Sequence, residues 1–295
     1  MTRWFTALTV TVALSLSATA CTGPAETPPD AKVEVGGTKE AVNSDAKVEA
    51  VVKEVAPATD APVLNVPPRG KAERDCANSD PKEFDAKTLA PMTLPADANA
   101  AMTDPKLATE KAPEKFKVKF ETSKGDFIVE AYRPWSPNGV DRFYNMVKIG
   151  WFNEVKFFRA VDGFMTQFGV TPYPEANSAW LDARIPDDEV VQGNKRGVLT
   201  FAQCPRPNCR SNQLFINTKD NSFLDRQRFA GFAVVVEGMD VVDSMYTCYG
   251  DAGRPGRPSP NAKGPDQGLV QRLGNAYLDA GWPNLDGIKS ATIVE

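Results

Sequence analysis

The chain has 295 residues, a hydrophobic content of 42% and a formal net charge of −4. It contains no histidine, which excludes Ser-His-Asp triads, Cys-His nucleophiles and every metal site that uses a histidine ligand. The small net negative charge gives no electrostatic basis for binding nucleic acid.

The first 20 residues are typical of a secretory signal peptide. A basic residue precedes an apolar run that ends near Ala18 and is too short for a membrane span. The small residues that lead into Cys21 resemble a bacterial lipoprotein box, which implies a lipidated Cys21 that anchors the chain to a membrane. We therefore expect a lipoprotein of the bacterial cell envelope that faces the periplasm, with Thr22 slightly favouring the outer membrane. Ordinary cleavage after Ala20, which leaves a free thiol, is the alternative.

Residues 21–115 are predicted to form a disordered linker. From residue 22 onward this stretch contains 12 of the 24 prolines and a single aromatic residue, Phe84. It carries 12 basic and 17 acidic residues and no sustained hydrophobic period. Such a composition buries too little apolar surface to fold alone, so we expect a tether that gives the following domain reach.

Residues 116–295 are predicted to be the folded domain, because they contain 24 of the 27 aromatic residues. Alternating apolar and polar residues predict a strand over 116–121, a turn, and a returning strand over 126–132. Ser136 and Pro137 predict the start of a helix that ends before Gly150. Further strands are predicted over 155–161, 197–202, 214–217, 232–236 and 288–294, a second helix over 240–245, and a long loop over 250–268. Many short strands with only two helices indicate an all-β barrel or sandwich.

Three segments of this domain combine polar side chains with large apolar ones. The segment 157–169 places Arg159 and Gln167 among phenylalanine, valine and methionine residues. A guanidinium cannot lose its charge, so burial there requires acceptors, unless the side chain only lies over the edge of the core. The segments 213–218 and 221–232 are rich in aromatic residues, which by themselves could be core positions.

Together, in this order and spacing, the three segments resemble the cyclophilin family of peptidyl-prolyl cis–trans isomerases. The pattern Phe-x-Arg-x-x-x-Gly-Phe-Met-x-Gln and the string Gln213-Leu214-Phe215-Ile216 carry the resemblance, which extends over residues 116–295. It implies a closed eight-stranded antiparallel β-barrel capped by two helices, with no cofactor and no metal. It also implies an isomerase that assists folding by acting on proline-containing segments of exported proteins. A cyclophilin-like module that binds such segments with little turnover is the alternative.

The resemblance also implies roles for individual residues. Arg159 corresponds to the catalytic arginine, and Gln167 to the residue that orients it. The implied substrate-binding residues are Phe164, Met165, Ala202, Gln203, Phe215, Phe223, Leu224 and Phe229. Three of them depart from the family pattern: Phe223 replaces a common Trp, Gln203 replaces Asn, and Phe229 takes the usual His position, with Arg228 as the alternative.

Four cysteines remain after Cys21, namely Cys76, Cys204, Cys209 and Cys248. In an exported chain they are expected to form disulfides, for which three connectivities exist. We expect Cys204 to pair with Cys209, because these two residues enclose a short turn-prone loop; Cys76 would then pair with Cys248. Four reduced, buried cysteines are the alternative. A Cys₄ metal site is disfavoured, because the spacing lacks paired C-x₂-C units.

Overall fold

The structure, a computed structural model, describes residues 64, 66–68, 76–77, 79–251 and 263–294. The predicted signal peptide, the predicted lipidation site Cys21 and the first part of the predicted linker lie outside the described residues. No helix in the described part of the chain combines the length and the apolar character that a membrane span requires.

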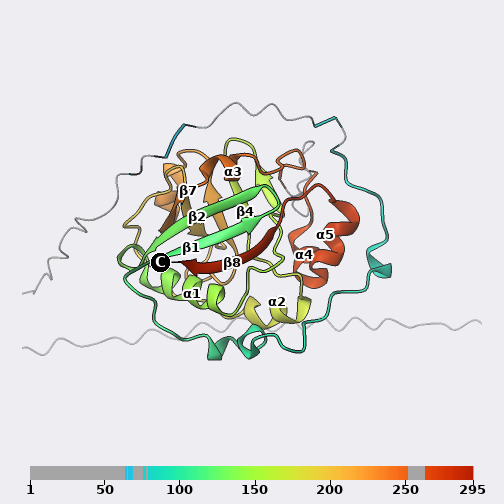
Figure 1. Cartoon of the computed structure of the whole chain (residues 1–295), viewed down its shortest axis with the longest axis horizontal. Coiled ribbons are helices and arrows are strands. Elements are labelled where there is room, and N and C mark those ends of the chain that lie inside the picture. Colours follow the sequence, from blue (N-terminus) through green and yellow to red (C-terminus); the bar gives the residue numbers. More distant parts are fainter. Residues whose placement is uncertain (1–63, 65, 69–75, 78, 252–262, 295) are drawn as a thin grey trace, which may run out of the picture. The chain divides into compact units, whose positions relative to one another are not determined.

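An antiparallel sheet of eight strands forms the centre of the domain and confirms the all-β prediction (Figure 1). Its strand order is β3-β4-β6-β5-β7-β2-β1-β8. The strands are β1 (Lys115–Thr122), β2 (Gly125–Tyr132), β3 (Arg159–Val161), β4 (Met165–Phe168), β5 (Val198–Phe201), β6 (Leu214–Asn217), β7 (Gly231–Glu237) and β8 (Ile288–Val294). Strand β4 was not among the strands that the sequence pattern predicted, and all four of its residues are buried.

The sheet is curled but is not the closed barrel that the sequence predicts. In the described residues, the end strands β3 and β8 share no ladder; the segments before them meet through an isolated bridge between Lys156 and Gly287. Strand β3 has only three residues, whereas the sequence pattern predicts a strand over 155–161. Phe157 packs in the main core, whereas Phe158 packs with the C-terminal helices.

The main core lies between the sheet and helix α1 (Pro137–Lys148). Strands β1 and β2 bury alternate residues, and Phe120 of β1 stacks on its cross-strand partner Phe127 with ring centroids 4.9 Å apart. Helix α1 contributes Phe143, which packs against Phe120 and against Phe232 of β7. The predicted helix after Ser136 is therefore confirmed.

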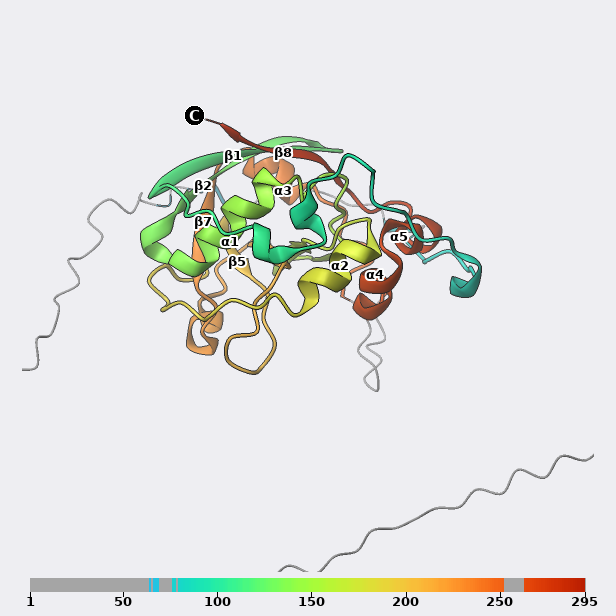
Figure 2. The same ribbon diagram turned by 90° about the horizontal axis from the view of Figure 1, so that it is seen from below.

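The prediction of only two helices is wrong. Helix α3 (Met239–Asp243) matches the second predicted helix, but the described residues also form α2 (Pro174–Leu181), α4 (Gln267–Leu273) and α5 (Asn275–Gly281). Helix α4 includes the last residues of the predicted loop over 250–268. Helices α2, α4 and α5 lie together at one end of the sheet (Figure 2). Each is seven or eight residues long, so packing rather than helical propensity stabilises it.

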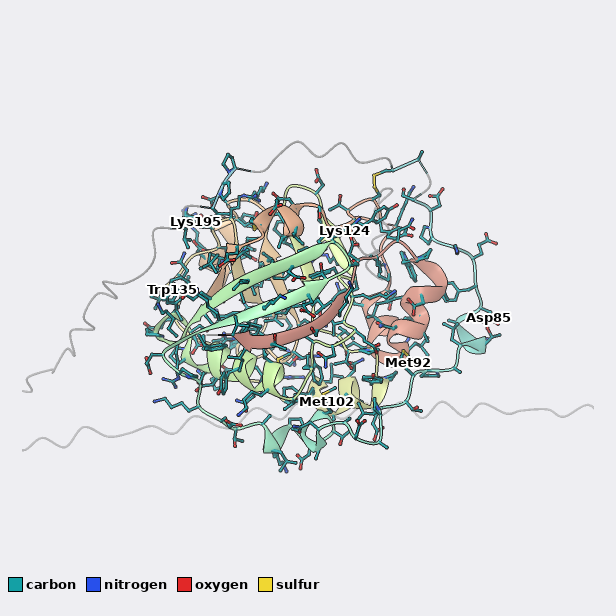
Figure 3. All side chains as sticks on the ribbon, viewed as in Figure 1. Asp85, Met92, Met102, Lys124, Trp135 and Lys195 are labelled. Atoms are coloured by element: carbon teal, nitrogen blue, oxygen red, sulfur yellow. A yellow bond between two sulfur atoms is a disulfide. The ribbon has the colours of Figure 1, made fainter. Side chains whose placement is uncertain are left out.

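The prediction of a disordered linker is wrong for residues 79–115. This arm forms three 3-10 helices, Ala86–Thr88, Ala100–Met102 and Pro105–Leu107. Phe84 packs edge-on against Trp282, and Met102 lies in the main core (Figure 3). The indole of Trp180 in α2 donates to the carbonyl of Ala101 at 2.9 Å. The arm has few apolar residues, but it is ordered because it packs against the core of the domain.

The arm is expected to contribute to the stability of the domain. Met102 is 4% exposed, so Met102→Ala should lower the free energy of unfolding by about 2–4 kcal/mol through lost packing. Leu107 lies in the same arm but is 59% exposed, and Leu107→Ala should change stability by less than about 0.5 kcal/mol. Urea denaturation followed by tryptophan fluorescence measures both. Equal, small effects would show that the arm is not part of the cooperative unit.

Candidate active site

A cavity of about 990 Å³ opens beside β3, β4 and β6. All the catalytic and substrate-binding residues implied by the sequence line it except Phe223: Arg159, Phe164, Met165, Gln167, Ala202, Gln203, Phe215, Leu224 and Phe229. Phe223 is 55% exposed, and its ring stacks on Phe164 with centroids 6.0 Å apart. The structure thus brings together residues that are up to 70 positions apart in the sequence.

The floor of the cavity is apolar. Met165, Phe215 and Leu224 are buried and form one cluster, against which Phe164 and Phe229 pack. These residues come from three elements, β4, β6 and the 3-10 helix Ser222–Gln227, together with the segments beside them. A compact apolar recess of this kind suits a small aliphatic ring such as that of proline.

Arg159 and Gln167 are direct partners across the β3–β4 hairpin. The Nη1 group of Arg159 donates to Oε1 of Gln167 at 3.0 Å, and Nε2 of Gln167 donates to Oε1 of Gln213 at 2.7 Å. Gln167 is 4% exposed, and the side chain of Arg159 is 18% exposed. The amide of Gln167 is thus held between Gln213 and the guanidinium, which lies at the edge of the apolar floor.

Asp251 is a site residue that the sequence analysis missed. Its carboxylate accepts from Nε of Arg159 at 2.6 Å and from Nη2 at 3.1 Å. The two residues are 92 positions apart, and Asp251 lies in no recognisable motif. The only available signal was the physical requirement that a partly buried guanidinium needs acceptors.

The loop that forms another wall of the cavity is closed by a disulfide between Cys204 and Cys209. The other two cysteines, Cys76 and Cys248, are joined as well. Directly before this loop, the side chain of Gln203 donates to the carbonyl of Gln227 at 2.7 Å. In the described residues, no group of three or more His, Cys, Asp or Glu side chains could hold a metal ion.

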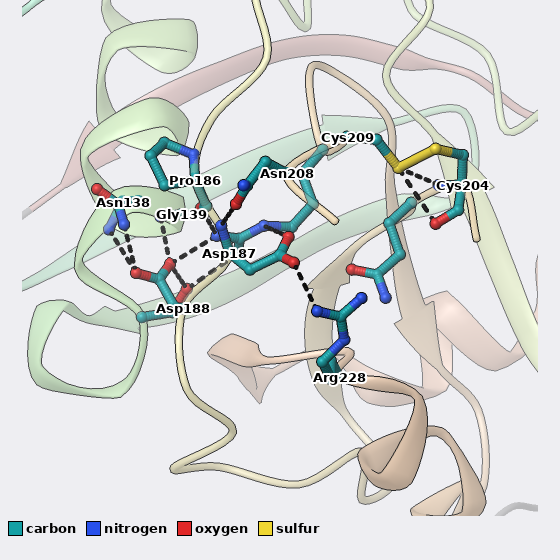
Figure 4. Close-up of polar contacts among 12 residues, drawn as sticks. Asn138, Gly139, Pro186, Asp187, Asp188, Cys204, Asn208, Cys209 and Arg228 are labelled. Atoms are coloured by element: carbon teal, nitrogen blue, oxygen red, sulfur yellow. Dashed lines mark hydrogen bonds and ion pairs between the residues drawn. A yellow bond between two sulfur atoms is a disulfide. The ribbon is translucent and has the colours of Figure 1, made fainter. Parts of the chain in front are cut away.

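A buried ion pair between Arg210 and Asp188 lies next to this loop, and Figure 4 shows Asp188 with the groups of Asn138 and Gly139 that donate to it. Arg210 directly follows the disulfide and is 1% exposed; its Nη2 lies 3.0 Å from the carboxylate of Asp188. Asp188 also accepts from the backbone N–H groups of Asn138 at 3.1 Å and Gly139 at 3.0 Å, and from the hydroxyl of Ser136. Asp188 therefore caps helix α1, whereas Ser136, the predicted N-cap, makes no side-chain cap.

The same contacts set the charge of Asp188. Burial by itself raises the pKa of Asp188, but hydrogen bonds from Ser136, Gly139 and Asn138 and the charge of Arg210 lower it below its ordinary value. A group with a depressed pKa in the folded state stabilises the fold above its unfolded-state pKa. That stabilisation is lost as the pH falls through the folded-state pKa.

Asp188→Asn should lower the free energy of unfolding by about 3 kcal/mol at pH 7, because Arg210 loses its nearest buried counter-charge and keeps the more distant Asp187, 3.9 Å from its Nε. The difference from wild type should begin to shrink below about pH 4, where unfolded wild type takes up a proton on this carboxylate, and should vanish only as the pH falls through the lower folded-state pKa. Denaturation of both proteins from about pH 3 to about pH 7, a range that includes the ordinary Asp pKa, measures this difference in the free energy of unfolding. Asp182→Asn, on a carboxylate that is 84% exposed, is the control with little effect. A difference that stays constant with pH would contradict the assignment.

Comparison with known proteins agrees with this geometry. Residues 117–263 match the family model of the cyclophilin type peptidyl-prolyl cis-trans isomerase. The chain is 32% identical over 138 residues to peptidyl-prolyl cis-trans isomerase B of Escherichia coli, covering 43% of this chain and 82% of that protein. It is 35% identical over 135 residues to a peptidyl-prolyl cis-trans isomerase of Acinetobacter baylyi, covering 43% of this chain and 70% of that protein.

A cyclophilin type isomerase of Cryptosporidium parvum, known as a crystal structure, aligns with 61% of this chain and 98% of its own, at 17% identity and a TM-score of 0.44. From the family model and the sequence relatives, the chain belongs to the cyclophilin-type peptidyl-prolyl cis–trans isomerases, and it is an isomerase. The cavity has one wall beyond the matched range: Asp266, Gln267, Gly268 and Arg272, in and just before α4.

Proposed function

We propose that this isomerase turns X-Pro bonds in the cavity described above, with Arg159 as the catalytic residue and Gln167 orienting it. The observation that carries the proposal is a guanidinium, fixed by an amide on the neighbouring strand, at the edge of an apolar recess. In this assignment Phe164, Met165, Phe215 and Leu224 hold the proline ring. Ala202 and Gln203 bind the peptide backbone N-terminal to it, and Phe229 closes the recess.

The chemistry needs no nucleophile. Rotation about a peptide bond is opposed by about 18–20 kcal/mol, because the C–N bond has partial double-bond character. X-Pro bonds populate both isomers but exchange only in tens to hundreds of seconds. In the twisted transition state the conjugation is lost, and the prolyl nitrogen becomes pyramidal and gains a lone pair that accepts a hydrogen bond.

An N–H group of Arg159 that donates to this nitrogen lowers the barrier selectively. The planar ground state has no such lone pair, so the hydrogen bond stabilises the transition state more than the bound peptide. The apolar recess holds the ring while the chain before it rotates. The partly buried position strengthens the interaction, because fewer water molecules compete for the donor.

Arg159→Ala should lower kcat/KM for a proline tetrapeptide by about 10²–10³, the usual effect of removing a transition-state donor. Arg226→Ala removes an exposed arginine that does not line the cavity, and it should leave kcat/KM unchanged. Circular dichroism should confirm that both variants are folded. If Arg159→Ala isomerises as fast as Arg226→Ala, the catalytic assignment of Arg159 is wrong.

We further propose that the enzyme is a lipoprotein of the bacterial envelope that assists the folding of exported proteins. The apolar run and the small residues before Cys21 support it. Two disulfides, Cys76–Cys248 and Cys204–Cys209, also support an oxidising compartment. In this proposal, the chain between Cys21 and the arm gives the domain reach from the membrane to its substrates.

The lipidation proposal is tested on the intact chain expressed in a bacterium. Wild type should incorporate radiolabelled palmitate, and Cys21→Ser should incorporate none, because the acyl groups are carried by that cysteine. Thr22→Ser keeps the cysteine and should retain the label. A mature wild-type protein that starts at Cys21 with no acyl mass would contradict the proposal.

A further inference from the structure

Asp251 holds the guanidinium that the reaction requires. Its two carboxylate oxygens lie 2.6 Å from Nε and 3.1 Å from Nη2 of Arg159, so the pair is bidentate. We propose that Asp251 is a positioning residue, which fixes the plane of the guanidinium so that its remaining donors meet the peptide. This role rests on the proposed catalytic function of Arg159.

The donors of Arg159 can be counted. A guanidinium has five N–H groups, in a rigid planar fork. Asp251 accepts from two of them and Gln167 from a third. Two N–H groups, one on each Nη, are left for a substrate. Asp251 holds the guanidinium along the Nε–Nη2 edge, and Gln167 holds it at Nη1. Together these contacts prevent the plane of the guanidinium from rotating, so the two remaining N–H groups keep a fixed direction.

Backbone contacts fix Asp251 itself. Gly250 pairs with Ala160 in an isolated antiparallel bridge, directly beside Arg159. The N–H of Gly264 donates to the carbonyl of Asp251 at 3.0 Å. Three residues before Asp251, Cys248 is linked to Cys76 by a disulfide. The carboxylate is therefore placed by the strand pairing of the site itself, in the same way as Gln167.

A carboxylate beside Arg159 has two opposing effects on catalysis. It orients the guanidinium, and it also offsets part of the positive charge that stabilises the transition state. The carboxylate of Asp251 is 46% exposed, so water and salt screen its charge. Screening weakens the effect of the charge, but it does not change the direction of the hydrogen bonds between Asp251 and Arg159. We therefore expect orientation to be the larger effect, and removal of Asp251 to slow the enzyme.

The test combines Asp251 and Arg159 variants in the full-length protein. Asp251→Ala should lower kcat/KM for a proline tetrapeptide by about 10- to 100-fold, mainly through kcat, as is usual when an orienting partner is lost. Asp251→Asn should be similarly slow, because its amide offers one acceptor in place of two. Asp251→Glu keeps both oxygens and should recover part of the activity.

A matched surface variant controls for the loss of one negative charge. Asp126 lies on β2, is 50% exposed and contacts the ammonium group of Lys119 at 2.9 Å, and it does not line the cavity. Asp126→Ala should therefore leave kcat/KM unchanged. In the double variant Arg159→Ala/Asp251→Ala, loss of the carboxylate should have no further effect, because a positioning residue acts only through its partner.

The orientation of the Arg159 guanidinium can also be observed without measuring catalysis. The Nε–H signal of Arg159 in a ¹H–¹⁵N spectrum should lie downfield in wild type and move upfield in Asp251→Ala. Arg133 makes the same side-on contact with Asp141, at 2.8 Å and 3.0 Å, and its signal should not move. This internal reference separates a local change from a change in folding.

The outcomes distinguish the two proposals. If Arg159→Ala is as active as wild type, the proposed function fails, whatever the Asp251 variants do. If Arg159→Ala is slow but Asp251→Ala or Asp251→Asn equals or exceeds wild type, only the positioning role is wrong, and the carboxylate merely offsets charge. Additive losses in the double variant, or an unchanged Nε–H signal, would also overturn it.

Discussion

The proposed active site depends on a guanidinium that keeps its charge at the edge of an apolar recess. Such a group persists only where acceptors are fixed around it, and the curled sheet supplies them from both sides. Strand register places Gln167 directly opposite Arg159, and a backbone bridge at Ala160 brings Asp251 to the other edge of the fork. The short hairpin of β3 and β4 thereby presents a polar donor next to an apolar floor.

The rest of the domain supports that arrangement from a distance. The loop that ends at Cys209 is closed by a disulfide, and the residue after it, Arg210, is held by Asp188 at the start of helix α1. Helix α4 and the residue before it add a wall beyond the part of the chain that matches the family model. This wall depends in turn on packing between the C-terminal helices and the arm, where Phe84 contacts Tyr277.

The sequence predicted the features that are local or that follow a motif. Alternation predicted β1, and the family pattern identified Arg159 and Gln167 as neighbours. The sequence pattern did not predict the features that depend on contacts between distant segments of the chain. The arm has too few apolar residues to predict its burial, yet Met102 reaches the main core. No sequence motif identifies Asp251, because its position is determined by a backbone bridge between its neighbour Gly250 and the distant residue Ala160.

The most direct measurement of the central claim is the rate of cis–trans exchange of a proline peptide on the enzyme, obtained by exchange NMR at saturating protein. If Arg159 acts only at the twisted transition state, Arg159→Ala should bind the peptide within about twofold of wild type and exchange it about 10²–10³ times more slowly. An unchanged exchange rate with an affinity reduced by the same factor would contradict the claim, because Arg159 would then bind both planar isomers rather than the transition state.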